Sequence, residues 1–143
     1  MSPDPERCAE AREWLIRARH DLLAAHVLLG TQPALSDVAV YHCQQAAEKA
    51  LKAFLFWHDR PFRKTHDLEE LGAQCVALDA SLDSLLDKTS TLTPYAWQFR
   101  YPGPAIEPTT TEAAEAALLA EDVLKAVVQR LPPEVNPEPT KRT

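Results

Sequence analysis

Four polar side chains recur at helical spacing near the middle of the chain: His42, Gln45, Lys49 and Lys52. Steps of three, four and three residues place them on one side of an α-helix. An imidazole, an amide and two ammonium groups in one row can bind phosphate through charge-assisted hydrogen bonds. The alternative is a solvated helix face, on which a Glu48–Lys52 pair one turn apart contributes only about 0.3 kcal/mol.

Two further segments carry groups that could join this row. His58–His66 (HDRPFRKTH) is locally positive, and His66 precedes an expected helix, whose N-terminus disfavours a protonated imidazole and favours anions. A local cap or turn contact is the other role open to His66. Arg100 ends a helical pattern beside a loop that Pro102 and Pro104 keep extended, which would present its guanidinium in a fixed direction. If the helix ends meet, these groups form one cationic cluster at one end of the fold.

The hydrophobic spacing predicts the helices that position these groups. Asp4–Pro5 begins a first helix that runs to Leu29, with Gly30 in the left-handed C′ position. A second helix spans about 35–57, a third about 68–78 after a Thr65 or Asp67 cap, and a fourth about 82–91, interrupted at Thr93–Pro94. A fifth begins at a Thr109–Glu112 capping box and closes at Pro132.

One face of the second helix is lined mainly by small residues, which allow close helix contacts: Ala39, Cys43, Ala46, Ala50, Ala53 and Trp57. We therefore expect an all-α protein, an up-and-down antiparallel helical bundle of four to five helices. Residues 1–132 form this domain, and 133–143 are expected to be a disordered C-terminal tail.

Composition narrows the classes of function. The chain has 143 residues, of which 45% are hydrophobic, and its net charge of −6 argues against broad coating of nucleic acid by a basic surface. The absence of a long apolar run or a signal sequence predicts a cytoplasmic protein without a membrane span. Cys8, Cys43 and Cys75 are expected to be packed thiols. No metal-ligand or phosphate-loop motif is present, so we expect no metal and no cofactor.

Several pieces of the sequence together resemble the HEPN domain: AREWLIRARHDLLAAHVLL (11–29), YHCQQAAEKALKA (41–53), KTHDLEEL (64–71), FRYPG (99–103) and EAAEAALLAEDVLKAV (112–127). The resemblance covers about residues 8–131. It implies a helical bundle that is often dimeric and that binds a nucleotide or RNA. It also implies partnership with a small nucleotidyltransferase, sometimes as a toxin–antitoxin pair.

Many HEPN members resemble metal-independent endoribonucleases that use an arginine and a histidine a few residues apart near a dimer interface. Here no histidine follows Arg100, and the matching spacing is Arg60 to His66, with five residues between them. Arg60 and His66 are therefore the catalytic candidates. The absence of such an arginine–histidine pair near the C-terminal end of the sequence favours a protein that is not an enzyme.

Three hypotheses follow. The first is a non-catalytic HEPN module that works beside a nucleotidyltransferase and binds nucleotide or RNA through His42, Gln45, Lys49, His66, Arg100 and Tyr101. The second is an endoribonuclease toxin that uses His66 or His42 with Arg60 or Arg100. The third is a helical dimer whose polar row only specifies the interface. We expect a homodimer in each case, because a second copy would bury the alanine-rich helix face and the exposed aromatic rings.

Overall fold

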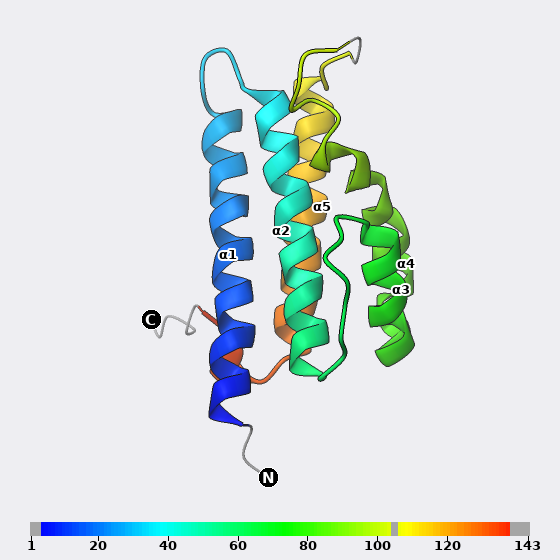
Figure 1. Cartoon of the computed structure of the whole chain (residues 1–143). Coiled ribbons are helices and arrows are strands. Elements are labelled where there is room, and N and C mark those ends of the chain that lie inside the picture. Colours follow the sequence, from blue (N-terminus) through cyan, green and yellow to red (C-terminus); the bar gives the residue numbers. More distant parts are fainter. Residues whose placement is uncertain (1–3, 104–105, 138–143) are drawn as a thin grey trace.

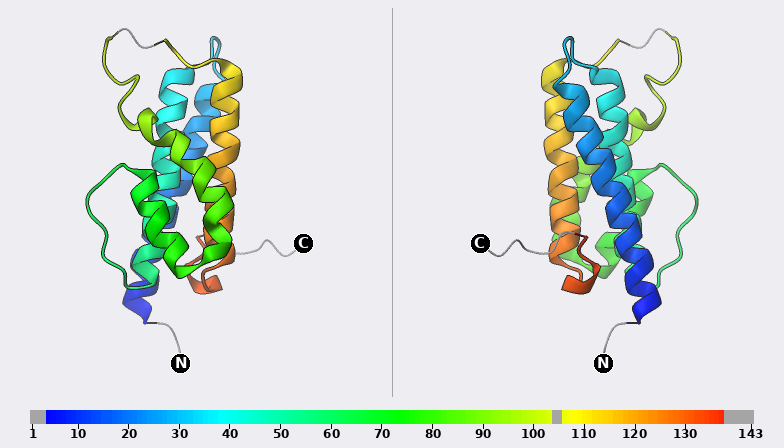
Figure 2. Two further views of the ribbon diagram at one scale, coloured as in Figure 1. Left: turned by 90° about the vertical axis from the view of Figure 1, so that its right-hand side faces the viewer. Right: turned by 90° about the vertical axis from the view of Figure 1, so that its left-hand side faces the viewer.

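Two long helices, α1 (Pro5–Leu29) and α2 (Ser36–Trp57), form an antiparallel hairpin that the rest of the chain packs against (Figure 1). α5 (Thr110–Gln129) packs against both of them, and α3 (Leu68–Leu78) and α4 (Asp83–Thr89) lie to one side (Figures 1 and 2). The structure is a computed structural model that describes residues 4–103 and 106–137. Within these ranges it contains helices and no strand, so the predicted all-α bundle is confirmed.

α1 begins and ends close to where the sequence predicts, but its C-terminus has a different geometry. Asp4 caps the helix by accepting a hydrogen bond from the Glu6 amide at 3.0 Å, and Pro5 occupies the first turn. Gly30 has φ −86°, so the predicted left-handed conformation is wrong. Its amide instead donates to the carbonyls of His26 and Val27, which continues the right-handed turn and needs no positive φ.

The small-residue seam of α2 is the centre of the core. Ala39, Cys43, Ala46, Ala50 and Ala53 have no exposed surface, and α2 packs against both α1 and α5. Burial raises the pKa of the Cys43 and Cys75 thiols to about 12, which agrees with their predicted role as packed thiols. The seam is therefore covered within one chain, and a second copy is not needed to bury it.

The third and fifth helices start at the predicted caps. The Asp67 side chain accepts hydrogen bonds from the first amides of α3, and Thr109 and Glu112 form the predicted capping box of α5. The fourth helix is shorter than predicted: α4 ends at Thr89 and continues as a 3₁₀ segment, Ser90–Ala96, which contains Pro94. Proline lacks the amide hydrogen of an α-helical turn, which accounts for the change in geometry.

The path between α2 and α3 departs from a simple up-and-down order. Residues 58–67 return along α2, so that α3 runs in the same direction as α2 (Figure 1). Gln74 of α3 donates to the Pro61 carbonyl, and Gln44 of α2 donates to the His66 carbonyl, both at 3.0 Å. These bonds fix the returning segment at both ends and bring its last residues to the middle of α2.

The C-terminal part of the described chain also packs on the bundle. Pro133–Val135 forms a 3₁₀ turn, η3, and Val135 has no exposed surface, although the sequence predicts a disordered tail from residue 133. Arg12 of α1 donates to the Asn136 carbonyl at 3.3 Å. An apolar side chain placed next to the first helix is enough to extend the core by one turn. Residues 138–143 of the predicted tail lie outside the described residues. No described helix is long and apolar enough to cross a membrane.

Candidate functional site

Asp21 on α1 holds two of the predicted site residues of α2. One carboxylate oxygen accepts a hydrogen bond from His42 Nδ1 at 2.8 Å, and the other accepts one from Lys49 Nζ. The Asp21 side chain is 12% exposed, whereas those of His42 and Lys49 are about one-quarter exposed. Asp21 is therefore the acceptor that fixes His42 and Lys49 in the row.

Glu48 on α2 holds the second group. His66 Nδ1 donates to Glu48 Oε1 at 2.7 Å, and Lys52 Nζ donates to Oε2 at 3.0 Å. The amides of Gln44 and Gln45 also donate to Oε1, at 3.2 and 3.4 Å. Glu48 is 4% exposed, so these donors replace water around a buried carboxylate.

Lys52 is buried beside two aromatic rings. Its Nζ lies 5.8 Å from the centroid of the Trp14 ring and 5.7 Å from that of Phe62, and those two rings meet edge to face at 6.0 Å. The rings bring α1 and the returning segment 58–67 against the same ammonium group. Lys52 of α2 thus contacts both α1 and the segment 58–67. Its charge is paired with Glu48.

Arg100 lies at the other end of the row. Its guanidinium carbon is 4.8 Å from the centroid of Tyr41 and 5.8 Å from that of Tyr101. The Tyr41 ring in turn contacts the His42 ring edge to face at 5.2 Å. Arg100, Tyr101 and His42 are therefore joined through Tyr41, a residue that the spacing of the row did not select.

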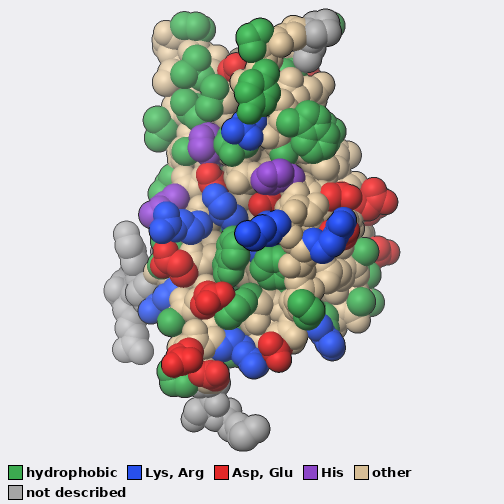
Figure 3. All heavy atoms as spheres, viewed as in Figure 1, with side chains coloured by type: hydrophobic (Ala, Val, Ile, Leu, Met, Phe, Trp, Pro, Cys, Tyr) green, Lys and Arg blue, Asp and Glu red, His purple; other side chains and the backbone are tan. Residues whose placement is uncertain are grey.

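The predicted row therefore forms one continuous face, which we call the polar face and define by His42, Gln45, Lys49, His66 and Arg100. Figure 3 views this side of the molecule: Lys, Arg and His side chains gather in a band over α1, α2 and the segment 58–67, with acidic side chains among them. Gln45 is 7% exposed, and its side-chain amide donates to the side chains of Gln44 and Glu48. It therefore helps to hold the buried side of the polar face and offers little surface to a ligand. Glu48 could have been found from sequence as an acidic residue at helical spacing to the row, whereas no spacing relates Asp21, on α1, to the row on α2.

Arg60 does not belong to the polar face. Its amide donates to the Leu55 carbonyl at 2.9 Å, which places it at the C-terminus of α2, whereas His66 lies beside Glu48. Seven residues of helix separate Glu48 from Leu55, or about 10 Å along the axis. Arg60 instead lies near His58, whose pKa is lowered by partial burial and then by the Arg60 charge. The Arg60–His66 spacing does not bring the two side chains together.

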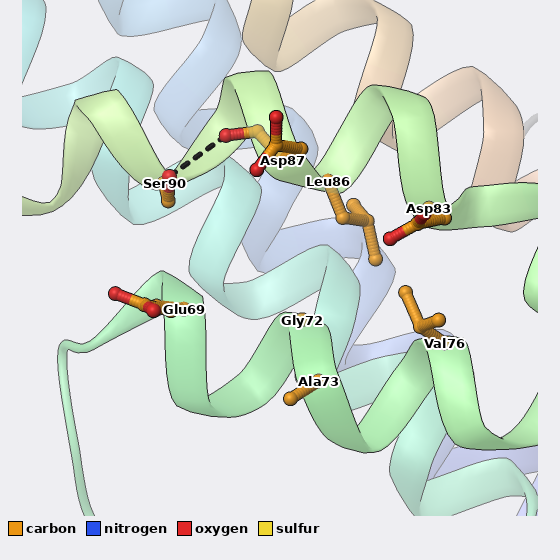
Figure 4. Close-up of a pocket in the computed structure, with 8 residues that line it drawn as sticks. All are labelled: Glu69, Gly72, Ala73, Val76, Asp83, Leu86, Asp87 and Ser90. Atoms are coloured by element: carbon orange, nitrogen blue, oxygen red, sulfur yellow. Dashed lines mark hydrogen bonds between the residues drawn. The ribbon is translucent and has the colours of Figure 1, made fainter.

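A pocket of about 360 Å³ lies elsewhere, between α3 and α4 (Figure 4). Its apolar wall includes Val76 and Leu86, and its rim carries the carboxylates Glu69, Asp83 and Asp87. None of the predicted site residues lines it. Three carboxylates disfavour a phosphate group, so this pocket does not suit the predicted ligand. Among the described residues, no three His, Cys, Asp or Glu side chains are placed to hold a metal ion.

A family model for the HEPN domain matches residues 11–131. The chain belongs to the HEPN family. The crystal structure of TT1696 from Thermus thermophilus is similar to this HEPN protein, with 33% sequence identity and a TM-score of 0.71. The match covers 85% of this chain and 98% of that one. No curated protein gives a significant match to this HEPN chain.

The contacts of Glu48 in this HEPN domain predict a large loss of stability on its removal. Glu48→Ala leaves the Lys52 ammonium buried without a counter-charge, so we expect the free energy of unfolding to fall by about 3–5 kcal/mol. Glu121→Ala is the matched control, because Glu121 and Lys125 form an exposed pair with the same spacing on α5. Glu121→Ala should lower the free energy of unfolding by about 0.5 kcal/mol or less. Urea denaturation measures both, and equal losses would contradict the role assigned to Glu48.

Proposed function

We propose that this HEPN domain binds a nucleotide or a segment of RNA at the polar face, without cleaving it. The observation that supports this most is the fixation of the row by two buried carboxylates. Asp21 and Glu48 each hold one imidazole through Nδ1 and one ammonium group. Each imidazole is thus held in one orientation, with Nε2 as the ring nitrogen that remains for a ligand.

The chemistry of the row suits phosphate oxygens. Within the described residues, neither His42 nor His66 makes a hydrogen bond through Nε2, and the His66 side chain is 57% exposed. Lys49 has one hydrogen bond, to Asp21, and an ammonium group can donate three. A bound phosphate would accept hydrogen bonds from these groups without displacing their carboxylate partners. Preformed donors of this kind lower the ordering cost of binding.

A partner protein is part of the proposal. The HEPN resemblance implies partnership with a small nucleotidyltransferase, in some cases as a toxin–antitoxin pair, and we propose the same kind of partner here. A cytoplasmic location fits this role. A nucleotidyltransferase reading frame beside the gene would support it.

The binding proposal predicts the effect of removing one charge. Lys49→Gln should weaken binding of ATP or of a short single-stranded RNA about 10- to 150-fold, because a hydrogen bond to a charged group is worth ~1.5–3 kcal/mol. Lys125→Gln, an exposed lysine of α5, is the matched control and should bind normally. Titration calorimetry with ATP and fluorescence anisotropy with labelled RNA measure the two ligands. If wild-type protein binds neither at millimolar concentration, the proposal is wrong.

We also propose a homodimer, now on different grounds from those of the sequence. Leu23 and Val27 lie one turn apart on α1 and are 59% and 68% exposed, and Leu118 of α5 is 62% exposed. Apolar side chains at this level of exposure are common at interfaces between subunits. Light scattering should give twice the mass of the chain, and Val27→Asp should reduce it toward the monomer. A monomeric wild-type protein would remove this part of the proposal.

An endoribonuclease is the second candidate function, and the two carboxylate-held imidazoles favour it. A neutral imidazole could take the proton of a 2′-hydroxyl, whose oxygen attacks the adjacent phosphorus. The bond from phosphorus to the 5′-oxygen breaks, and a protonated imidazole donates its proton to that oxygen. The products are a 2′,3′-cyclic phosphate and a 5′-hydroxyl, and no metal is needed. His42 and His66 would supply the two imidazoles.

Incubation of RNA with the purified protein in EDTA separates this candidate from the first. The binding proposal expects intact RNA. Cleavage to a 2′,3′-cyclic phosphate that is lost in both His42→Ala and His66→Ala would establish the nuclease instead. His20→Ala, an exposed histidine of α1, controls for a general effect of losing an imidazole. Cleavage that persists in all three variants would indicate a contaminating nuclease.

A further inference from the structure

Three side chains at the Arg100 end of the polar face form a stack that the phosphate chemistry above does not use. Arg100 lies over the Tyr41 ring at 4.8 Å and also contacts the Tyr101 ring at 5.8 Å. We call Tyr41, Arg100 and Tyr101 the aromatic platform. It continues directly into the row, because Tyr41 contacts His42 edge to face.

The platform is open to solvent in a way that core aromatic rings are not. Tyr101 is 71% exposed, and Trp97, in the turn that precedes it, is 54% exposed. Phe54, by contrast, is 1% exposed. Arg100 is also exposed, whereas Tyr41 is half-buried beneath it. An exposed tyrosine ring beside a guanidinium plane offers the surfaces on which bases of single-stranded nucleic acids stack. A solvent-facing ring held by an arginine costs little to order when a base covers it.

We propose that the aromatic platform is a base-stacking site, and that the ligand of this face is a single-stranded nucleic acid segment rather than a free mononucleotide. This rests on the proposed function, which it makes more specific. One base lies on the platform, and the phosphates that follow it run past His42 and Lys49 toward His66. Tyr41 and Glu48 are seven residues apart on α2, so this path is about 10 Å long along the helix. A mononucleotide stacked at one end would leave the other end without a partner.

The pocket beside the platform supports a strand over an enclosed nucleotide. Its volume is about 260 Å³, and its lining includes Arg100 and Tyr101 together with the carboxylates Asp37 and Glu107. Pockets that enclose a whole small ligand usually measure about 300–1,000 Å³. The two carboxylates disfavour a phosphate in this pocket, whereas an N–H group of a base, such as the ring N3–H of uracil, can donate to them. A base is therefore the better occupant of this end, and the phosphates belong to the row.

The charge balance of the row indicates that stacking contributes a large share of the affinity. Lys49 is paired with Asp21 and Lys52 with Glu48, so the two lysines and the two carboxylates cancel. The whole chain carries a formal charge of −6. Long-range attraction of phosphate is then weak, and few counterions are released on binding. The affinity should depend on the bases more strongly than on the salt concentration.

The experiment compares a labelled oligouridylate with a strand of the same length that lacks its bases. Fluorescence anisotropy should show about 5- to 150-fold weaker binding of the abasic strand, equivalent to ~1–3 kcal/mol for one stacked base. Tyr101→Ala should weaken binding of oligouridylate by a similar factor and leave binding of the abasic strand unchanged. Tyr101→Phe keeps the ring and should bind oligouridylate as the wild type does. Tyr101 is exposed, so these changes are not expected to unfold the protein, and circular dichroism checks this.

Four outcomes would overturn the inference. Equal affinity for the two strands, or normal binding of oligouridylate by Tyr101→Ala, would show that no base stacks there, while the proposed phosphate binding would stand. Competition by uridine monophosphate at the same concentration as the strand would show that the ligand is a mononucleotide. Binding of neither strand and of no mononucleotide would overturn the proposed function as well.

Discussion

The buried carboxylate of Glu48 is the constraint on which the arrangement of this face depends. It lies in the middle of α2, 4% exposed, and accepts hydrogen bonds from Lys52, His66, Gln44 and Gln45. A buried charge is tolerated only when it is paired and hydrogen-bonded, so hydrogen-bond donors from the surrounding chain must lie next to Glu48. The segment 58–67 returns along α2 and places one of them, His66, beside the carboxylate. The same residue that stabilises the fold thus orients an imidazole at the surface.

Asp21 repeats the arrangement one helix away. It joins α1 to α2 through His42 and Lys49. Two carboxylates with one imidazole and one lysine each make a face that is nearly neutral yet rich in oriented donors. Such a face differs from a basic patch, which attracts any polyanion by charge alone. It suits a ligand that is recognised by contacts at fixed positions, such as the nucleotide or RNA proposed above.

The other surfaces of the molecule are chemically distinct from this face. The pocket between α3 and α4 has an acidic rim, and apolar side chains are exposed on α1 and α5. A bundle can keep such surfaces separate because each helix presents one stripe to the core and leaves its other sides free. The alanine seam of α2 is the stripe that faces the core. Its small residues let α1 and α5 pack closely against the helix that carries the row.

Local patterns in the sequence determined the helices and their caps. Asp4–Pro5, Asp67 and the Thr109–Glu112 box act within one turn, and the alanine seam follows the helical period, so all of them are predictable from neighbouring residues. The HEPN motifs also identified the family. The Glu48–Lys52 pair likewise follows from their spacing on one helix. The left-handed conformation of Gly30 was predicted incorrectly, and α4 ends at Thr89, two residues before the predicted end. Only the tertiary structure decided that Asp21 pairs with His42 and Lys49, that His66 pairs with Glu48, and that Arg60 stays apart from His66. Those partners are joined by the path of the chain in space, which the spacing of residues along it does not specify.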